Sequence, residues 1–324
     1  MSTADTPRDN SMVEPTKPQK IAVIGAGLMG HGIAQVFADA GHAVAIHDPD
    51  PAALARVPER VRAIFEALDA DPSTADLITL HEQLAGAVKD ADFVIEAGPE
   101  RVAIKCEIFA TLDTLTGPEV VLASNTSAIP IREIATKVSK RGRVLGMHFW
   151  NPPHFVPLVE VVQSTSTDMR FIARTMDLLT AAGMSPVHVR RDLPGFIGNR
   201  LQHALKREAI ALVADGVCDA QTLDRVVTEG FGSRLGVLGP LEQSDMVGLN
   251  LTLDAHRVLI ADLDRTPGPH PLLEAKVAAG ETGMAAGKGF RAWTPEQAAV
   301  VRKRFHDHLA SEARRRRTAR AGKP

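Results

Sequence analysis

The chain has 324 residues, of which 44% are hydrophobic and 23% are charged, and its formal net charge is −2. This balance is typical of a globular protein and excludes a general attraction to nucleic acid or to an anionic membrane. Two cysteines are too few for a disulfide framework, no apolar run reaches the roughly 18 residues of a membrane helix, and the polar start lacks the apolar segment of a secretion signal. We therefore expect a soluble, cytoplasmic protein without a metal site.

Both ends of the chain are predicted to be tails. Residues 1–17 are rich in Ser, Thr, Pro and charged side chains, which offer nothing to bury, so we expect a flexible tail there. Residues 313–324 contain the run RRRRTAR, which is short, terminal and free of aromatic residues. This pattern favours a basic tail that forms a solvated helix end over a nucleic-acid contact. We expect no nucleic-acid partner and no membrane partner.

Between the tails, the first half of the chain alternates strand patterns with helical patterns. Strands are predicted at 21–25, 43–47, 93–97, 120–125, 144–149, 158–162 and 187–189. Helices are predicted at 30–40, 52–68, 104–115, 131–138 and 171–182. Strands that alternate with helices indicate βαβ units and a parallel sheet. The fold class expected for 18–192 is therefore α/β, with a Rossmann-type doubly wound, mostly parallel sheet.

The second half, after the pair Pro194-Gly195, has a different character. Helices are predicted at 196–215, at 220–229, within 242–263 and at 272–279, and we see few strands. The Pro-Gly pair is a plausible hinge. We expect a smaller, all-helical C-terminal domain over 193–312. Its surplus of apolar positions on helices, such as Leu249, Leu251 and Leu253, predicts a homodimer.

The segment IGAGLMGHGIA follows the first predicted strand and opens the first predicted helix. It contains the pattern G-x-G-x-x-G as Gly25, Gly27 and Gly30, with Leu28 and Met29 in the same loop. The first glycine permits a tight turn, the second lets the backbone approach a pyrophosphate, and the third lets helix and strand pack closely. The helix N-terminus then faces the phosphates with free N–H groups. This pattern in this context predicts a dinucleotide site.

Asp48 ends the second predicted strand, about 20 residues beyond the glycines. A carboxylate there accepts hydrogen bonds from the adenosine ribose hydroxyls and repels a 2′-phosphate, which favours NAD(H) over NADP(H). The alternative is a solvated aspartate in a turn.

The stretch HFWNPPHFVPLVE, residues 148–160, places His148 at the end of a predicted strand and Glu160 in the next one. Oxidation of a hydroxyl by NAD⁺ needs a base for the O–H proton, and a histidine suits this because its reference pKa is about 6.5. A carboxylate on the second ring nitrogen would fix the tautomer. A histidine buried in the core is an equal alternative on spacing alone, and His154 is a second candidate.

Two further loops carry polar side chains of the right kind. Ser127 lies in SNTSAIP, which follows a predicted strand, and Asn199 lies in GFIGNRL, in the first turn of a predicted helix. Hydroxyl and amide groups are ordinary in loops and helix caps, so each is a weak indication by itself.

The combination of these motifs is similar to a known family. GAGLMGHGIA, FVIEAGPE with Lys105 five residues on, SNTSAIPI, HFWNPP…LVEVV and PGFIGNRL occur in one order across residues 21–201, and together they resemble the 3-hydroxyacyl-CoA dehydrogenase family. The helical half resembles that family's dimerising C-terminal domain through GVCDAQTLDRVVTEGFG, GPLEQSDMVGL and GKGF. The resemblance covers nearly everything except the tails.

The resemblance implies roles for single residues. His148 matches the catalytic base of the family, and Glu160 matches the carboxylate paired with it. Ser127 and Asn199 match the hydroxyl and the amide that hold the substrate's oxygens. His154 matches no functional position.

The cofactor side of the site follows in the same way. Asn151 matches an asparagine beside the nicotinamide end of NAD, and Glu100 and Lys105 match positions that contact NAD, as does Ser127. The resemblance implies NAD-dependent oxidation of a 3-hydroxyacyl-CoA to the 3-ketoacyl-CoA, or the reverse, in fatty acid metabolism.

Three departures from the family bear on the substrate. The lysine-bearing helical hairpin that clamps CoA is replaced by a shorter stretch that turns acidic at Asp69, Asp71 and Asp76, and a late lysine is replaced by Ala285. Relatives that act on gulonate, carnitine or a pyridine carboxylate share the dyad and the N-P-P turn. The alternative function is therefore the same chemistry on a non-CoA hydroxy acid, whose carboxylate needs a cation. The candidate cations are Arg200, Lys206, Arg207 and Arg234.

Two rival interpretations belong to other classes. One is an inactive scaffold that binds NAD, against which the intact set of catalytic candidates argues. The other is a dehydrogenase of the 6-phosphogluconate type with Lys206 as the catalytic lysine, but the segment GFIGNRLQHALKREA lacks that family's glycine spacing.

Overall fold

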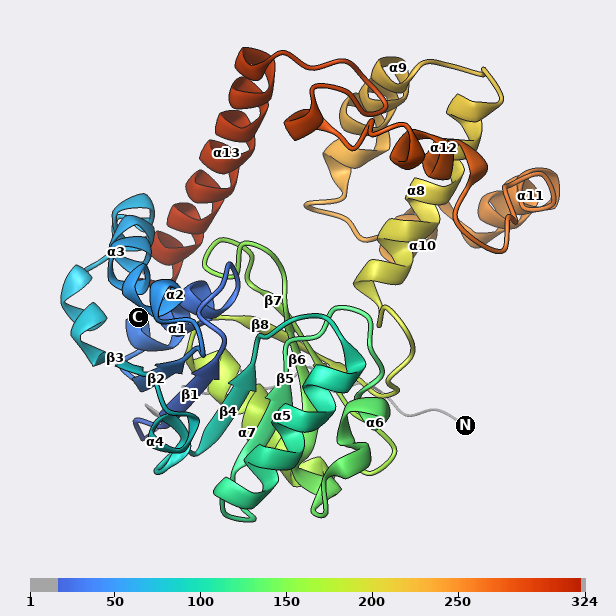
Figure 1. Cartoon of the computed structure of the whole chain (residues 1–324). Helices are drawn as coiled ribbons and strands as arrows, with labels where there is room; N and C mark the ends of the chain where they lie inside the picture. Colours follow the sequence, from blue (N-terminus) through green and yellow to red (C-terminus); the bar gives the residue numbers. More distant parts are fainter. Residues whose placement is uncertain (1–16, 322–324) are drawn as a thin grey trace. The chain divides into compact units, whose positions relative to one another are not determined.

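The computed structural model describes residues 17–321 (Figure 1), so the tail predicted over 1–17 lies outside the described residues except for Lys17. Its contacts divide the chain into two compact units. Unit 1 comprises the described residues up to Asn199 together with those from Asp307 onward, and unit 2 comprises Arg200–His306. No helix between residues 17 and 321 is both long enough and apolar enough to cross a membrane.

Unit 1 is built on one eight-stranded sheet with the order β3-β2-β1-β4-β5-β6-β7-β8. The strands are β1 (Lys20–Ile24), β2 (Ala43–His47), β3 (Ile78–His81), β4 (Phe93–Glu96), β5 (Val121–Ser124), β6 (Val144–Phe149), β7 (Leu158–Val162) and β8 (Ser185–Val189). Neighbouring strands are parallel except for β6 and β7, which pair antiparallel. The order reverses between β1 and β4, and ligands of doubly wound sheets bind at such a reversal. The predicted Rossmann-type, mostly parallel sheet is confirmed.

Helices cover both faces of this sheet (Figure 1). One face packs against α1 (Gly30–Asp39), α2 (Pro51–Ala55), α3 (Val57–Leu68) and α7 (Met169–Ala181). The other packs against α4 (Leu84–Val88), α5 (Val102–Leu115) and α6 (Ile131–Ile134). Short 3₁₀ turns are η1 (Pro72–Leu77), η2 (Ala135–Lys137) and η3 (Arg141–Arg143). Because the central strands are buried on both faces, they are continuous apolar runs rather than alternating ones.

The structure differs from the predicted elements of unit 1 in two places. The single helix predicted over 52–68 is two helices, because Pro58 lies in the first turn of α3, where a proline is tolerated, and could not lie in the interior of a longer helix. The elements β3 and α4 were not predicted. They are short, and β3 is a half-exposed edge strand with little apolar alternation.

Unit 2 is helical, as predicted. Its helices are α8 (Gly198–Ala214), which begins in unit 1, α9 (Ala220–Arg225), α10 (Pro240–Val247), α11 (Leu249–Leu259) and α12 (Pro271–Ala278), with short helical turns η4 (Val226–Gly230), η5 (Phe231–Arg234) and η6 (Met284–Ala286). The single long helix predicted within 242–263 is instead α10 and α11. The break falls at Gly248, whose φ of 96° ends a helix.

The last helix, α13 (Pro295–Ala321), starts in unit 2 and ends in unit 1. Ala310 and Ala313 are buried against α3 in one apolar cluster, whereas Arg314 and Arg315 are exposed. The solvated helix end predicted over 313–324 is therefore only partly correct for its described residues. Arg317 forms an ion pair with Asp39, the last residue of α1. Arg316 and Arg317 of this run therefore bind parts of unit 1 outside their own helix, and the described part of the predicted tail ends at Ala321.

A buried ion pair fixes the start of β6. The Asp113 carboxylate accepts a hydrogen bond of 2.8 Å from Arg143 Nη2, and Arg143 also donates to the Thr116 hydroxyl. Burial raises the pKa of Asp113, but the hydrogen bonds from Arg143 and Ser139 outweigh burial and lower the pKa to about 2. The ionised carboxylate is thus stabilised by folding.

We expect Asp113→Asn to lower the free energy of unfolding at pH 7 by about 2–3 kcal/mol. The folded pKa is lower than the unfolded one, so this stabilisation is present above about pH 4 and is lost as the pH falls towards 2. Urea unfolding at pH 7 and at pH 3 should therefore show a smaller difference between the two pH values for the variant than for the wild type. Equal stabilities of the two proteins at pH 7 would contradict the prediction.

Candidate active site

The antiparallel turn-back from β6 to β7 brings the predicted dyad together. His148 and Glu160 are directly opposite partners in the register of these strands. The His148 Nδ1 and Glu160 Oε2 atoms are 2.8 Å apart, and both side chains are buried. Cross-strand neighbours in an antiparallel pair lie side by side on one face of the sheet. The two side chains can therefore form a hydrogen bond although they are twelve positions apart in the sequence.

Both oxygen atoms of the Glu160 carboxylate form hydrogen bonds. Its Oε1 atom accepts hydrogen bonds from the backbone N–H groups of Ile197 (2.9 Å) and Gly198 (3.1 Å) at the start of α8. Burial raises the pKa of Glu160, but the hydrogen bonds from His148, Gly198 and Ile197 outweigh burial and hold the pKa below its usual value. An ionised Glu160 accepts a hydrogen bond from the Nδ1–H group of His148, which leaves Nε2 as the basic nitrogen. Within residues 17–321, the hydrogen bonds of His148 involve Nδ1 alone.

Two aromatic rings hold the imidazole. The ring centroids of Trp150 and Phe196 are each 5.7 Å from that of His148. Phe196 has a φ of 50°, and it follows Gly195 with a φ of 74°. This left-handed turn points the buried Phe196 ring at His148 and the next amides at Glu160. Neither ring was predicted as part of the site, because an aromatic residue in a sequence is most often a core residue.

The other two catalytic candidates lie close together. The Asn199 side-chain amide donates a hydrogen bond of 2.9 Å to the Ser127 carbonyl. The loop that carries Ser127 is also tied to β6, because Asn125 Oδ1 accepts from the Phe149 amide at 2.9 Å. The four predicted catalytic residues therefore all lie in unit 1.

Glu100 and Lys105 belong to a network whose centre, Glu96, was not predicted. Lys105 Nζ is 2.7 Å from Glu96 Oε1 and 3.4 Å from Glu100 Oε2, and both Lys105 and Glu96 are fully buried. Glu100 Oε1 accepts from the Thr126 hydroxyl (2.6 Å) and the Ser127 amide (2.9 Å). The signal for Glu96 was present in the sequence, since a single carboxylate inside the apolar strand FVIEA needs a buried cation.

The surroundings of Glu100 favour the ionised form of its carboxylate. Burial raises the pKa of Glu100, but hydrogen bonds from Thr126, the charge of Lys105 and the amides of Ser127 and Ala128 outweigh it, and the pKa of Glu100 lies below its usual value. Lys105 thus faces carboxylates on β4 and on the loop that follows it. The network holds the Ser127 loop through the Ser127 amide, whereas Asn199 binds the Ser127 carbonyl.

The glycine-rich turn lies at the reversal of the sheet, between β1 and α1. A Cβ atom at Gly25 would lie 2.7 Å from the Ala97 carbonyl oxygen, and one at Gly30 would lie 1.7 Å from the Gly25 carbonyl oxygen. A Cβ atom at Gly27 would have nothing within 4 Å. Gly25 and Gly30 are therefore required by close packing, whereas Gly27 leaves open space at the helix N-terminus for a pyrophosphate. The exposed Leu28 and the half-buried Met29 complete this loop.

Asp48 joins the end of β2 to this turn. One carboxylate oxygen accepts from the Ala26 amide at 2.7 Å and the other accepts from the Asp50 amide at 2.9 Å. A carboxylate has about four acceptor positions, so it has capacity left for ribose hydroxyls. The residues present therefore fit NAD.

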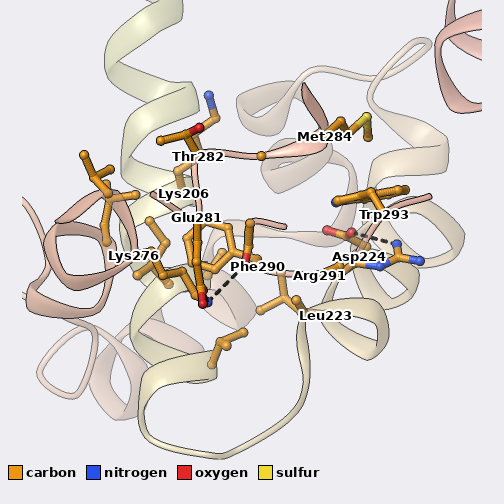
Figure 2. Close-up of a pocket in the computed structure, with 18 residues that line it drawn as sticks. Lys206, Leu223, Asp224, Lys276, Glu281, Thr282, Met284, Phe290, Arg291 and Trp293 are labelled. Carbon is orange, nitrogen blue, oxygen red and sulfur yellow. Dashed lines mark hydrogen bonds and ion pairs between the residues drawn. The ribbon is translucent and has the colours of Figure 1, made fainter. Parts of the chain in front are cut away.

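The other candidates make contacts with described residues other than the dyad. His154 packs against Phe155, with ring centroids 4.3 Å apart. Arg207 is 3.5 Å from the Asp264 carboxylate in unit 2. Lys206 lines a pocket of about 490 Å³ that is formed within unit 2 and is shown in Figure 2.

A glycine-rich turn at the reversal of a parallel sheet and a carboxylate-oriented histidine in the same unit define a nucleotide-dependent oxidoreductase. The 3-hydroxyacyl-CoA dehydrogenase NAD binding domain matches residues 20–193, and the C-terminal domain of the same family matches residues 195–293. The chain therefore belongs to the 3-hydroxyacyl-CoA dehydrogenase family. It is an NAD-dependent oxidoreductase of this type.

Three relatives illustrate the range of the similarity. The 5-formyl-3-hydroxy-2-methylpyridine 4-carboxylate 5-dehydrogenase of Mesorhizobium japonicum is 37% identical over 284 residues, which is 86% of this chain and 92% of that protein. The crystal structure of a 5-formyl-3-hydroxy-2-methylpyridine 4-carboxylic acid 5-dehydrogenase, an NAD⁺-dependent dismutase, has a TM-score of 0.86 and 34% identity over 93% of this chain and 99% of its own. The structure of (S)-3-hydroxybutyryl-CoA dehydrogenase from Ralstonia eutropha has a TM-score of 0.71 and 31% identity over 86% of this chain and 100% of its own.

We expect Asp48→Asn to raise the dissociation constant of NADH about tenfold, because one charged hydrogen-bond acceptor is lost. The preference for NADH over NADPH should fall at the same time, since the repulsion of a 2′-phosphate disappears. Fluorescence titrations with both nucleotides measure the two effects. Asp50→Asn is the matched control, because Asp50 is an exposed cap of α2 and an asparagine caps a helix equally well. The same NADH affinity in both variants would contradict the assignment.

Proposed function

We propose that the chain transfers hydride between the carbon of a secondary hydroxyl group and NAD, with His148 and Glu160 as the catalytic dyad. The observation that carries this proposal is the hydrogen bond of 2.8 Å between His148 Nδ1 and Glu160 Oε2, with the carboxylate held by two further amides. This arrangement leaves Nε2 free to take the hydroxyl proton in oxidation and to return it in reduction. The positive charge that forms on the imidazole is stabilised by the buried carboxylate.

The other residues orient the substrate and the cofactor. Ser127 and Asn199 hold the substrate's oxygens, and the hydrogen bond between their loops supports this role. NAD, when bound, supplies the acceptor or donor of the hydride. Gly25, Gly27, Leu28, Met29, Gly30 and Asp48 bind its adenosine and pyrophosphate, and Glu100, Lys105, Ser127 and Asn151 lie towards its nicotinamide. Because Lys105 is buried, we propose that it acts by orienting Glu100.

Two substrate classes fit this chemistry, namely 3-hydroxyacyl-CoA thioesters of fatty acid metabolism and small hydroxy acids without CoA. We propose the second, on two observations. Asp69, Asp71 and Asp76 are exposed after α3, where carboxylates repel the phosphates of CoA. The similarity to the pyridine-carboxylate enzyme also has a higher TM-score over a larger share of the chain than that to the hydroxybutyryl-CoA enzyme.

A substrate panel distinguishes the two classes. The assay follows NADH at 340 nm with acetoacetyl-CoA and, in the oxidative direction, follows NAD⁺ reduction with gulonate, carnitine, 3-hydroxybutyrate and hydroxylated pyridine carboxylates. We expect kcat/KM to be highest for a small acid. A higher value for acetoacetyl-CoA would overturn the substrate proposal and leave the dyad intact. Tight NADH binding without turnover on the whole panel would instead favour the inactive scaffold.

We further propose that the chain forms a homodimer through unit 2. Within Arg200–His306 the buried apolar residues are Ala211 and Ala298, whereas Leu241, Leu249 and Val258 are each at least 62% exposed. A unit of this length normally buries large apolar side chains in a core of its own. A second copy of the same surface is the partner that covers these residues.

The pocket of unit 2 supports the same proposal. Its wall is mostly apolar and includes Leu223, Phe290 and Trp293 (Figure 2). Ion pairs between Lys276 and Glu281 (3.0 Å) and between Asp224 and Arg291 (3.7 Å) neutralise the charges at its edge. Size-exclusion chromatography with light scattering tests the assembly. We expect a dimer, and a monomer at micromolar concentration would contradict the proposal.

The remaining expectations are proposals of the same kind. We place the NAD-binding domain at 18–192 and the helical substrate and dimerisation domain at 193–312. The division of contacts after Asn199 supports the first boundary, whereas the described residues from Asp307 group with unit 1. The two free cysteines, Cys106 and Cys218, are compatible with a cytoplasmic location.

A further inference from the structure

We propose that the end of α13 is a positioning element of the active site, and that Arg316 is its positioning residue. The proposal rests on the proposed function, in which Asn151 lies beside the nicotinamide. The Arg316 guanidinium donates a hydrogen bond to the carbonyl oxygen of Phe155. Phe155 ends the short turn that begins at Asn151, directly after β6 and the catalytic His148.

The turn is closed by its own backbone. The amides of Phe155 and Val156 donate to the Pro152 carbonyl at 3.1 and 3.0 Å. A displacement at the Phe155 carbonyl is therefore transmitted to the Asn151-Pro152 peptide, because the two are joined within one hydrogen-bonded turn. Asn151 itself is exposed, so its position depends on the support of this turn.

The turn is packed against three helices, α1, α3 and α13. On one side, a Cβ atom at Gly32 of α1 would lie 2.6 Å from Pro153 Cγ, so α1 touches the turn directly. On the other side, the Phe155 ring is buried in a cluster with Ile64 and Leu68 of α3 and with Ala310 and Ala313 of α13. The helix α1 starts at the predicted pyrophosphate site, so the same turn is braced against the cofactor helix.

The sequence of α13 suits this docking. Ala310 and Ala313 are one turn apart and small, which lets the helix approach α3 closely. Arg316 and Arg317 continue the same face, and Arg317 pairs with Asp39 at the end of α1. Arg315 is different, because it is 75% exposed and pairs with Glu312 of its own helix. Arg316 therefore binds the active-site turn, whereas Arg315, its neighbour in the same run of arginines, pairs with a residue of its own helix.

The test compares Arg316→Ala with Arg315→Ala, which removes the same charge from the adjacent position. In the cofactor-free protein, we expect faster hydrogen exchange at the Phe155 and Val156 amides in Arg316→Ala only. With the best substrate of the panel, we expect kcat to fall about tenfold and KM for NAD⁺ to stay within about twofold. Arg316→Lys should recover most of the rate, because an ammonium group can donate to the same carbonyl.

Each result decides the proposal. Equal exchange and equal kcat in the Ala variants at positions 315 and 316 would overturn it, as would faster exchange without a change in kcat. If Arg316→Ala does not fold, Arg316→Gln takes its place with the same criteria. If the wild type turns over no substrate, the proposed function fails. The positioning role is then decided by exchange and by the emission of bound NADH, which should change in Arg316→Ala and not in Arg315→Ala.

Discussion

Replacement of His148 by alanine is expected to lower kcat about 10³-fold, the range of a general base. In the proposed function the imidazole takes the hydroxyl proton, and Trp150 and Phe196 cannot replace it because their rings carry no base. NADH binding should stay within about twofold, since the glycine turn and Asp48 follow other strands, β1 and β2. Steady-state kinetics and fluorescence titration measure the two quantities.

A controlled comparison strengthens this test. His148→Gln keeps a polar side chain of similar size and should lose as much activity as His148→Ala, because an amide does not accept a proton near neutral pH. His154→Ala removes the second histidine candidate and should lower kcat at most about tenfold, as is expected for Arg316→Ala, because His154 lies in the same turn without acting as the base. A variant at position 148 with wild-type kcat would refute the assignment of the base.

Glu160→Gln is expected to lower kcat about 10²-fold, less than the loss of the base itself. The carboxylate accepts hydrogen bonds from His148 on one side and from Ile197 and Gly198 on the other. A glutamine has one acceptor oxygen, which would accept the hydrogen bonds from the Ile197 and Gly198 amides. The NH₂ group then faces Nδ1 and donates to it, which moves the imidazole proton to Nε2 and removes the basic nitrogen.

The tautomer explanation has its own signature. The ¹⁵N chemical shifts of His148 should show Nε2 as the protonated nitrogen in Glu160→Gln and Nδ1 in the wild type. Glu160→Asp, which keeps the charge but shortens the side chain, should keep the wild-type tautomer and lose less activity. A rate in Glu160→Gln equal to that of the wild type would show that the carboxylate is not needed to orient the base.

The sequence predicted the parts of the fold that depend on local pattern. The strands predicted at 21–25 and 144–149 agree with β1 and β6 to within one residue at each end. Strands buried on both faces are continuous apolar runs, which are easy to recognise in a sequence. The edge strand β3 and the helix α13 were missed, since one is half exposed and the other is rich in charge. The arginines that dock α13 look like solvated residues in the sequence because their partners, Asp39 and the Phe155 carbonyl, are far away in the chain.

The same limit applies to the site. The stiff turn and the two strands made a pair of His148 and Glu160 one of two equal interpretations, and the family resemblance favoured the pair. Glu96 was missed, although it is the buried centre of the network around Lys105, because a pattern of spacing does not reveal which carboxylate a lysine meets. The aromatic support of the imidazole depends on the left-handed turn at Gly195 and Phe196, which no local pattern predicted.

The antiparallel pairing of β6 and β7 has a consequence for how new specificities arise. Because the proposed base and its carboxylate lie on adjoining strands of a single sheet, they need no incoming ligand to assemble them. Residues that select a ligand can change in the surrounding loops while the proposed dyad keeps its geometry. A scaffold of this kind can exchange one alcohol for another through mutation at its periphery, without having to evolve its chemistry a second time.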